Sequence, residues 1–267
     1  MNFYDYISSK HLRITPDMFK ELYLDTDLVQ VQHRDQFPLD IYCYGRKAVQ
    51  NDHWDYVTCR CRGIVVNRET GEIIARPFEK FHNYGSTQAM ETPEMKYSAE
   101  NYWIQKPTVW EKVDGFLCTL YTWEGVPYIA SKGSFHSIHA KWATAEYRRH
   151  IEAYCSIPWP EGYTPVFEGL HRDLRIVVDY GQRQGLILLA LVNNETGEEM
   201  EPEALELWGD KTGFDTPERF NPTWASAVEE TRKEHRGEFG TEEGYVMTWY
   251  RPGQTPFRLK LKFIEYL

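Results

Sequence analysis

Short strand-like segments run through most of the chain, and they constrain the fold more than any other feature of the sequence. Each segment is rich in Ile, Val and aromatic residues and ends near Gly, Pro, Asn or Asp, as β-strands that lead into turns do. The expected strands cover residues 63–67, 72–78, 108–113, 116–123, 165–169, 175–180, 186–192, 244–250 and 257–263. Helical patterns are too few to alternate with these strands, so we predict an α+β fold with largely antiparallel sheets.

Three helices are expected between the strands. Apolar residues recur at spacings of three and four between residues 140 and 154, which predicts an amphipathic helix over residues 137–155. The pair Asn221-Pro222 has the residue types of an N-cap and a first helical position, and it predicts a helix running toward Arg236. Thr15-Pro16 predicts a short N-terminal helix for the same reason.

One turn sequence occurs twice. Residues 67–72 read Asn-Arg-Glu-Thr-Gly-Glu and residues 193–198 read Asn-Asn-Glu-Thr-Gly-Glu, while their flanking sequences differ. We therefore expect two hairpins with the same turn rather than an internal repeat. The acid-rich stretch from Glu195 to Glu206 is expected to be a solvated hairpin tip and loop.

Composition excludes several classes of protein. The 267 residues carry a net charge of −10, so the overall field cannot attract a polyanion, which must instead dock on a local basic site. The longest apolar run, residues 186–192, is far shorter than the roughly 20 residues of a transmembrane helix, and the N-terminus has no secretory pattern. We expect a cytoplasmic protein without a membrane span. Five Cys without a Cys-x-x-Cys pair argue against a disulfide framework and a zinc finger.

The segment from Lys112 to Gly115, Lys-Val-Asp-Gly, is the first candidate for chemistry. On its own, Lys112 is consistent with a lysine at a strand end, and Asp114 with a structural residue of the turn. The functional interpretation makes Lys112 a nucleophilic amine, with Asp114 and Gly115 forming a tight turn that lets backbone approach a bound phosphate.

Further motifs flank this segment in a fixed order. Arg62-Gly63 and Arg76-Pro-Phe-Glu-Lys80-Phe precede it, and Ser131-Lys132-Gly-Ser, Glu168-Gly, Glu243-Gly and Lys260-Leu-Lys262 follow it. The series resembles the motifs of covalent nucleotidyltransferases, the superfamily of polynucleotide ligases and mRNA capping enzymes. Within it, the chain looks most like the ATP-dependent RNA ligases of the bacteriophage RNA ligase 1 type. The resemblance covers residues 60 to 262.

The resemblance implies a fold, a reaction and a set of site residues. The fold would be a nucleotidyltransferase domain of residues 1–267 with sheets flanking an ATP pocket; residues 1–90 would supply Arg62 and Lys80, and residues 91–267 a core with Lys112. Lys112 would attack ATP to form lysyl-AMP, AMP would pass to an RNA 5′-phosphate, and a 3′-hydroxyl would displace it. The residues implied to bind ATP are Arg62, Lys80, Asp114, Gly115, Lys132, Glu168, Glu243, Lys260 and Lys262.

The resemblance also implies cofactors and partners. Magnesium would assist phosphoryl transfer, with Glu168 and Glu243 as its carboxylates, and RNA with 5′-phosphate and 3′-hydroxyl ends would be the substrate. No obligate protein partner is inferred. With five residues after Lys262, we expect no helical C-terminal domain and no OB-fold. A bacteriophage origin would place the protein in the host cytoplasm.

Elementary chemistry sets a condition on Lys112. The pKa of an unperturbed lysine is about 10.4, so only about one amine in a thousand is neutral near pH ~7.4. Nearby cations would lower that pKa by disfavouring the ammonium, and the candidates are Arg62, Lys80, Lys132, Lys260 and Lys262. A salt bridge to one of these five cations is the alternative role for Glu168 and for Glu243. Because side chains alternate along a strand, Lys260 and Lys262 should share one face while Leu259 and Leu261 point to the core. The structural alternative is that these two lysines lie on an exposed edge strand and prevent it from pairing with another chain.

Three rival functions remain open at this stage. A DNA ligase or a GTP-dependent capping-type nucleotidyltransferase would use the same lysine, and the nucleotide that labels the protein would distinguish them. A catalytically silent RNA-end-binding protein would grip ends without forming an adduct. A generic α+β fold with accidental motifs would form no covalent AMP at any pH.

Overall fold

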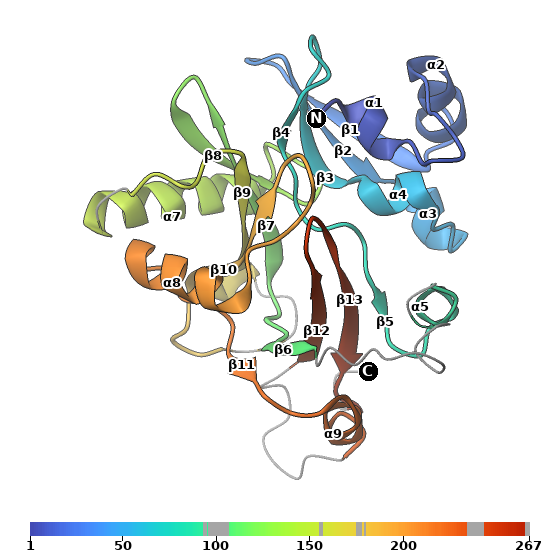
Figure 1. Ribbon diagram of the computed structural model, residues 1–267. Helices are drawn as coiled ribbons and strands as arrows, with labels where there is room; N and C mark the ends of the chain where they lie inside the picture. The colour runs from blue at the N-terminus through green and yellow to red at the C-terminus, as the bar shows by residue number, and fades with distance from the viewer. Residues whose placement is uncertain are drawn as a thin grey trace. The chain divides into compact units, whose positions relative to one another are not determined.

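The computed structural model describes residues 1–92, 95, 107–154, 157–174, 178, 180–233 and 243–264. The chain forms two compact units. Unit 1 comprises Met1–Lys80, Leu117–Phe167 and Ala190–Glu195, and unit 2 comprises Phe81–Phe116, Glu168–Leu189 and Thr196–Leu267. The sheets are mostly antiparallel, with helices beside them, which confirms the predicted α+β class (Figure 1). Within the described residues, no helix is both long enough and apolar enough to cross a membrane.

The first sheet of unit 1 has the strand order β1-β2-β3-β4. Its strands are β1 (Val29–Arg34), β2 (Leu39–Tyr44), β3 (Arg62–Asn67) and β4 (Ile73–Ala75). The hairpin expected around residues 68–71 is confirmed, because β3 and β4 pair antiparallel and the Asn67 Oδ1 accepts a hydrogen bond from the Glu69 N–H at 2.9 Å. Asn193 Oδ1 accepts from the Glu195 N–H in the same way at 2.9 Å. The two turns therefore share their chemistry, but the prediction of a second hairpin is wrong, because the next element after β10 (Gly185–Asn193) is the helix α8 (Pro202–Thr212).

Short helices lie beside this sheet. They are α1 (Phe3–Ile7), α2 (Pro16–Phe19), a π-helical turn (Lys20–Leu24), α3 (Arg46–Gln50) and α4 (Tyr56–Arg60). The N-cap predicted at Thr15 is confirmed, since its side chain accepts from the Met18 N–H at 3.3 Å. Aromatic side chains fill the core beneath these helices: the rings of Phe3 and Tyr42 stack with centroids 4.5 Å apart.

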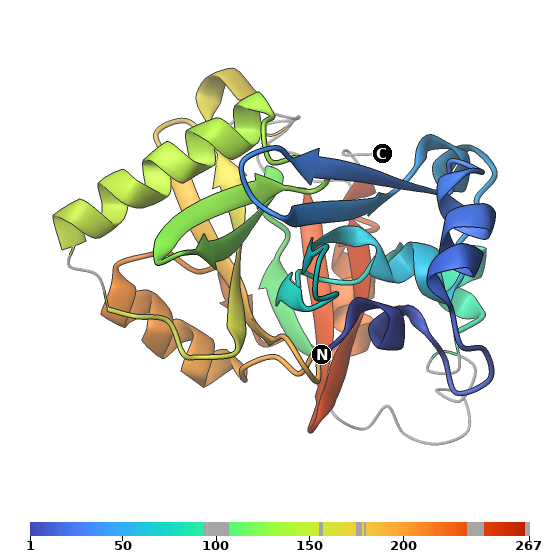
Figure 2. The ribbon, with the colours of Figure 1, turned by 90° about the horizontal axis from the view of Figure 1, so that it is seen from above.

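A hairpin and a long helix complete unit 1. Strands β7 (Phe116–Trp123) and β8 (Val126–Ser131) pair antiparallel across the left-handed residues Glu124 and Gly125. Helix α7 (Ile138–Tyr154) lies beside β8 (Figure 1 and Figure 2) and confirms the predicted amphipathic helix. The stripe is buried at Ala140, Ala143 and Tyr147, but Tyr154 at the helix end is exposed. In the sheet order β10-β9-β7-β8, the unit boundaries fall within β7, β9 (Tyr163–Leu170) and β10 (Gly185–Asn193).

Unit 2 contains a five-stranded sheet of order β11-β6-β12-β13-β5. The strands are β5 (His82–Asn83), β6 (Thr108–Glu111), β11 (Arg219–Phe220), β12 (Gly244–Arg251) and β13 (Gln254–Lys262). Strands β12 and β13 form a long antiparallel hairpin, visible side by side in both ribbon views. Buried Val109, Met247 and Leu259 lie in its core. The remaining elements are α5 (Thr87–Met90), a 3₁₀ turn (Arg172–Leu174), α8 and α9 (Trp224–Glu230).

Two predictions in unit 2 are wrong in part. Thr223, not Asn221, is the N-cap of α9, because its side chain accepts from the Ser226 N–H at 3.2 Å; the predicted end near Arg236 lies outside the described residues. The stretch expected to be a solvated loop instead enters α8 at Pro202, a first-turn proline, and Leu205 is buried. Residues 175–177 and 179 of the strand expected at 175–180 also lie outside the described residues.

Candidate active site

Lys112 directly follows β6 and is held by the backbone of β12. Its N–H donates to the Gly244 carbonyl at 2.9 Å, which continues the β6–β12 pairing by one residue. The side chain is only 17% exposed. The candidate nucleophile is therefore fixed at the end of a strand and largely shielded from water.

Gly244 brings β12 unusually close to β13. It pairs with Lys262 and has a φ of +142°, and a Cβ at this position would lie 2.0 Å from the Leu261 carbonyl oxygen. Only glycine fits both the conformation and the space. The close approach brings the preceding residue, Glu243, against the lysines of the neighbouring elements.

Glu243 forms an ion pair with two lysines. One carboxylate oxygen contacts Lys112 Nζ, and the other lies 3.0 Å from Lys262 Nζ. The Glu243 side chain is 4% exposed and that of Lys262 23% exposed. A carboxylate this deeply buried needs compensating charge, and the two ammonium groups supply it. We call Lys112, Glu243 and Lys262 the lysine–glutamate cluster.

The surroundings of the Lys112 amine differ from the expected cluster of cations. The group touching its amine is a carboxylate, and Lys262 bonds to that same carboxylate. An ammonium has no lone pair and cannot attack phosphorus, so the ion pair must open or pass its proton to Glu243 before reaction.

The predicted alternation along β13 is confirmed. Leu259 and Leu261 are buried, whereas Lys260 and Lys262 are half-buried on the other face. Lys260 Nζ lies 4.6 Å from the centroid of the Phe81 ring, a cation–π contact. Strand β13 lies between β12 and the two-residue strand β5, with which it pairs in parallel. This pairing covers Leu259 and Lys260, so Lys260 does not protect a free edge of the sheet.

Asp114, Gly115 and Glu168 form a second group in unit 2. The Gly115 N–H donates to Glu168 Oε1 at 3.1 Å, and a Cβ on Gly115 would lie 2.4 Å from the Gly169 carbonyl oxygen. Asp114 is buried, and its Oδ2 accepts from the Val178 N–H at 2.7 Å. Asp114 thus anchors the turn after Lys112, and its contact with a nucleotide stays a prediction.

Tyr180 is a partner that sequence reasoning missed. Its hydroxyl accepts a hydrogen bond from the Asp114 N–H at 2.7 Å, and burial raises its pKa. Asp114, Gly115 and Tyr180 line one pocket together with Gly169 and Arg172. The sequence offered no signal for Tyr180, because its role depends on a turn 66 residues away.

Arg62, Lys80 and Lys132 belong to unit 1 and lie near one another. Burial lowers the pKa of Lys80, and the positive charges of Arg62 and Lys132 act in the same direction. A Cβ on Gly63, whose φ is +95°, would lie 2.6 Å from the Lys132 carbonyl oxygen. The structure thus gathers three side chains of the predicted ATP-binding set in unit 1, and the six others and the nucleophile in unit 2.

Replacing Lys80 with Met should raise the free energy of unfolding near neutral pH. The pKa of Lys80 in the folded protein is lowered from 10.5, so between the folded-state pKa and 10.5 the unfolded chain holds more of this proton. Burying the charged amine therefore lowers the free energy of unfolding by its full amount at pH values below both pKa values. This loss of stability disappears as the pH rises through them. Urea unfolding at pH 7 and near pH ~10.5 should therefore show a gain that shrinks with pH. The exposed Lys141, replaced by Met, is the control; a loss of stability in Lys80→Met at neutral pH would contradict the argument.

Only two carboxylates, Glu168 and Glu243, were expected to hold magnesium. Among the described residues, no group of three or more His, Cys, Asp or Glu side chains could hold a metal ion. Magnesium is usually bound through one or two carboxylates together with substrate phosphates, so two carboxylates are enough for a site shared with ATP, and magnesium at Glu168 and Glu243 stays a prediction.

Comparisons with known proteins agree with the motif resemblance. A family model described as RNA ligase matches residues 60–266. RNA ligase 1 of bacteriophage TS2126 is 30% identical over 203 residues, which cover 70% of this chain and 47% of that protein. A protein of Autographa californica nuclear polyhedrosis virus, provisionally named a bifunctional polynucleotide kinase/RNA ligase, is 24% identical over 64% of this chain and 27% of its own length. The chain thus spans from about a quarter to half the length of these relatives.

A solved structure shares the fold. A protein from Aquifex aeolicus, provisionally named an ATP-dependent DNA ligase, superposes with a TM-score of 0.53 over 92% of this chain and 62% of that one, at 14% identity. The family match begins before Arg62 and extends past Lys262, so it includes all the motifs singled out above. This chain therefore belongs to the RNA ligase family, of the bacteriophage RNA ligase 1 type.

Proposed function

We propose that the chain is an ATP-dependent RNA ligase that joins the 5′-phosphate and 3′-hydroxyl ends of single-stranded or broken RNA. The observation that carries the proposal is the buried lysine–glutamate cluster, in which Lys112 Nζ contacts Glu243 in a chain of the RNA ligase family. A buried lysine paired with a potential proton acceptor is suited to nucleophilic catalysis.

In the first step, Lys112 Nζ attacks the α-phosphorus of ATP. A P–N bond forms, the bond from the α-phosphorus to the bridging oxygen breaks, and pyrophosphate leaves with the bonding electrons. The attacking amine must be neutral, and Glu243 is the group in contact with it that can accept its proton. Once Glu243 is neutral, the charge of Lys262 is available for the phosphates.

The second and third steps transfer the adenylate to RNA and then release it. An oxygen of the RNA 5′-phosphate attacks the phosphorus of lysyl-AMP, forming a pyrophosphate link while the P–N bond breaks and Lys112 regains its proton. The RNA 3′-hydroxyl then attacks the 5′-phosphorus, a phosphodiester forms, and AMP leaves. The hydroxyl proton passes to solvent or to a base.

The remaining site residues are assigned from the resemblance together with their local geometry. Lys260 and Lys262 lie on the strand face suited to phosphates, and Arg62 and Lys80 are assigned to phosphates by the resemblance alone. Lys132 is assigned to the nucleotide or RNA side. When bound, magnesium would supply charge neutralisation on the phosphates; the resemblance assigns Glu168 to it as a carboxylate, and Glu243 as a carboxylate in the steps in which it does not hold the Lys112 proton. The proposal treats residues 1–267 as one nucleotidyltransferase domain, with parts 1–90 and 91–267.

A donor and acceptor assay tests this proposal. The protein is incubated with magnesium and either ATP or GTP, each labelled in the α-phosphate, and the covalent adduct is counted. The protein is then given 5′-phosphorylated single-stranded RNA or DNA, and circular products are separated from linear adenylylated ones. We expect an ATP-specific adduct and RNA circles. Labelling by GTP alone, joining of DNA alone, or RNA binding without an adduct would each contradict the proposal.

A further inference from the structure

An aromatic pair in unit 1, Tyr44 and Trp54, holds one lysine at each end. The two rings meet edge to face, with centroids 5.1 Å apart and an interplanar angle of 89°. Lys80 Nζ lies 4.1 Å from the Trp54 ring centroid, and Lys132 Nζ lies 4.7 Å from the Tyr44 ring centroid. Lys132 also donates a hydrogen bond to the Tyr44 hydroxyl at 3.2 Å. We call Tyr44 and Trp54 the aromatic platform.

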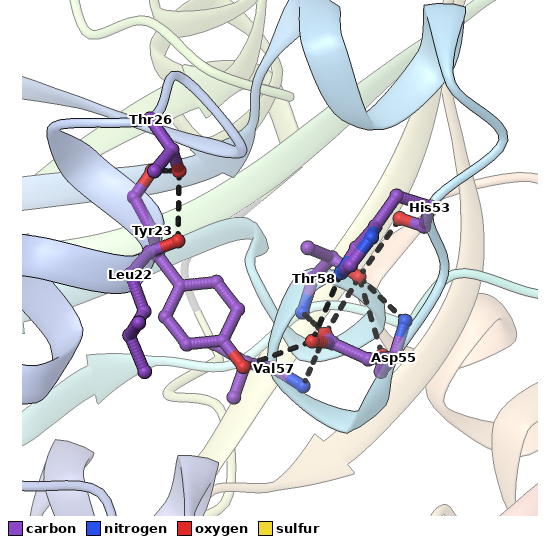
Figure 3. Close-up of polar contacts among 7 residues, drawn as sticks. All are labelled: Leu22, Tyr23, Thr26, His53, Asp55, Val57 and Thr58. Atoms are coloured by element: carbon purple, nitrogen blue, oxygen red, sulfur yellow. Dashed lines mark hydrogen bonds and ion pairs between the residues drawn. The ribbon is translucent and has the colours of Figure 1, made fainter.

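The backbone around the aromatic platform is firmly held. Tyr44 ends β2, and its N–H donates to the Cys61 carbonyl at 2.6 Å. Trp54 Nε1 donates to Asp52 Oδ1 at 2.7 Å. Asp55, the next residue, caps α4 by accepting from the Thr58 N–H at 2.8 Å, and it also accepts from the Tyr23 hydroxyl (Figure 3). The platform is therefore placed before any ligand arrives, which reduces the entropy lost on binding.

An open cavity of about 650 Å³ adjoins Tyr44 and Lys132. Strand β1, which lies at the end of the order β1-β2-β3-β4, supplies Gln30 and Gln32 to its lining, and the exposed Arg46 begins α3 there. Asp27 also lines the cavity, but its Oδ1 accepts a hydrogen bond from Gln30 Nε2 at 2.9 Å. The lining therefore combines two cations, one carboxylate and two side-chain amides with the Tyr44 ring.

Ordered aromatic rings beside fixed cations are the chemistry that binds single-stranded nucleic acid. Bases stack on aromatic rings whatever their sequence, while Lys and Arg contact the phosphates. The net charge of −10 means that such a strand must be held by local contacts of this kind. ATP offers the same base and phosphate chemistry. A polynucleotide is the better match, because the open cavity continues beyond Tyr44 and Lys132 to Arg46 and the β1 amides.

We propose that Tyr44, Lys132 and Arg46, with the cavity along β1, bind the single-stranded RNA substrate. This inference rests on the proposed function and assigns Lys132 to the RNA. A base of the strand packs against the Tyr44 ring, and Lys132 and Arg46 contact successive phosphates. Trp54 packs edge to face against Tyr44 and holds Lys80 over its own ring, so it supports the position of the Tyr44 ring.

Binding measurements on the full chain test the site. Fluorescence anisotropy with a 5′-phosphorylated single-stranded RNA should show that Tyr44→Leu weakens binding about tenfold, the loss of one base–aromatic stack. Tyr44→Phe keeps the ring and should stay within about threefold of the unmodified protein. Arg46→Gln should reduce the slope of log K against log salt by about 0.7, the loss of one phosphate contact on a single strand. The KM for ATP in adduct formation should stay within about twofold in all three variants.

Each other outcome overturns this inference without deciding the proposed function. A raised KM for ATP with unchanged RNA binding would assign Tyr44 and Lys132 to the nucleotide. Equal RNA affinity in Tyr44→Leu and the unmodified protein would make the aromatic platform purely structural. If Tyr44→Leu has a lowered melting temperature, the salt dependence of RNA binding by Arg46→Gln decides instead, because Arg46 is exposed; an unchanged slope would overturn the inference. Absence of an AMP adduct in the unmodified protein would instead refute the proposed function, whatever the RNA affinity.

Discussion

The variant Lys112→Arg should form no covalent AMP adduct, a loss limited only by the detection of the labelled protein. Arginine keeps a positive charge beside Glu243, so the buried carboxylate remains paired with two cations. The guanidinium stays protonated at any pH at which proteins are folded, so it has no lone pair for attack on phosphorus. Intact-protein mass spectrometry after incubation with ATP and magnesium would measure the adduct directly.

Lys112→Ala provides a second measurement of the same residue. It should also form no adduct, but it leaves Glu243 with Lys262 as its one remaining ion-pair partner in the cluster, so it should lose about 1–3 kcal/mol of unfolding free energy. Lys112→Arg should keep more of that stability. An adduct in either folded variant would assign the nucleophile to another residue, and the tryptic peptide that carries AMP would identify it.

Local patterns were sufficient for much of the fold and for part of the site. The two-residue period of Leu259 to Lys262 correctly placed both leucines in the core and both lysines on the opposite face. The helical spacing between residues 140 and 154 likewise located α7 to within about one residue at each end. Such patterns work because burial acts on every second residue of a strand and on one stripe of a helix.

Helix termini were harder to predict, because competing caps lie close together in the sequence. Asn221-Pro222 and Thr223 are both acceptable starts for α9, and the structure uses Thr223. The acidic stretch from Glu195 to Glu206 suggested a solvated loop, but Glu203 and Glu206 lie in α8 and pair with Arg219 beyond the helix, and Glu199 is buried against Arg258. These partners are too distant in sequence for a local pattern to reveal.

The same limit applies to the site. A list of cations suggested that Lys112 sits among positive charges, yet its direct partner is Glu243, 131 residues away. Glu243 was singled out as a metal ligand or a residue facing the nucleotide, which stays a prediction. Its ion pair with Lys262 agrees with the alternative, a salt bridge to one of the five cations, whereas its contact with Lys112 was not anticipated. Tyr44 and Trp54 carried no signal, because Tyr44 ends a strand, Trp54 lies between α3 and α4, and an aromatic residue in either place is usually part of a core. Cation–π contacts become visible only once the lysines are placed in space.

Glu243→Gln should destabilise the protein by about 2–4 kcal/mol, although the side chain keeps its shape. The change removes the negative charge that two largely buried ammonium groups share, and breaking a buried ion pair by neutralising one partner is costly. Urea unfolding followed by both circular dichroism and tryptophan fluorescence would measure the loss. Two probes are needed because the chain has two compact units, and a two-state analysis requires coincident transitions.

The double variant Glu243→Gln with Lys262→Met separates charge from packing. If the loss arises from uncompensated charge, then removing one ammonium should recover part of it, with a coupling energy of about 1–3 kcal/mol between the two positions. Lys141→Met is the matched lysine control, because Lys141 is an exposed residue of α7. It should not couple with Glu243→Gln. Additive effects in the first pair would show that Glu243 and Lys262 do not share an ion pair in solution.

Adduct formation by folded Glu243→Gln should fall by about 10²–10⁴-fold, as expected for loss of the proton acceptor; an unchanged rate would exclude Glu243 from the chemistry while leaving its structural role intact.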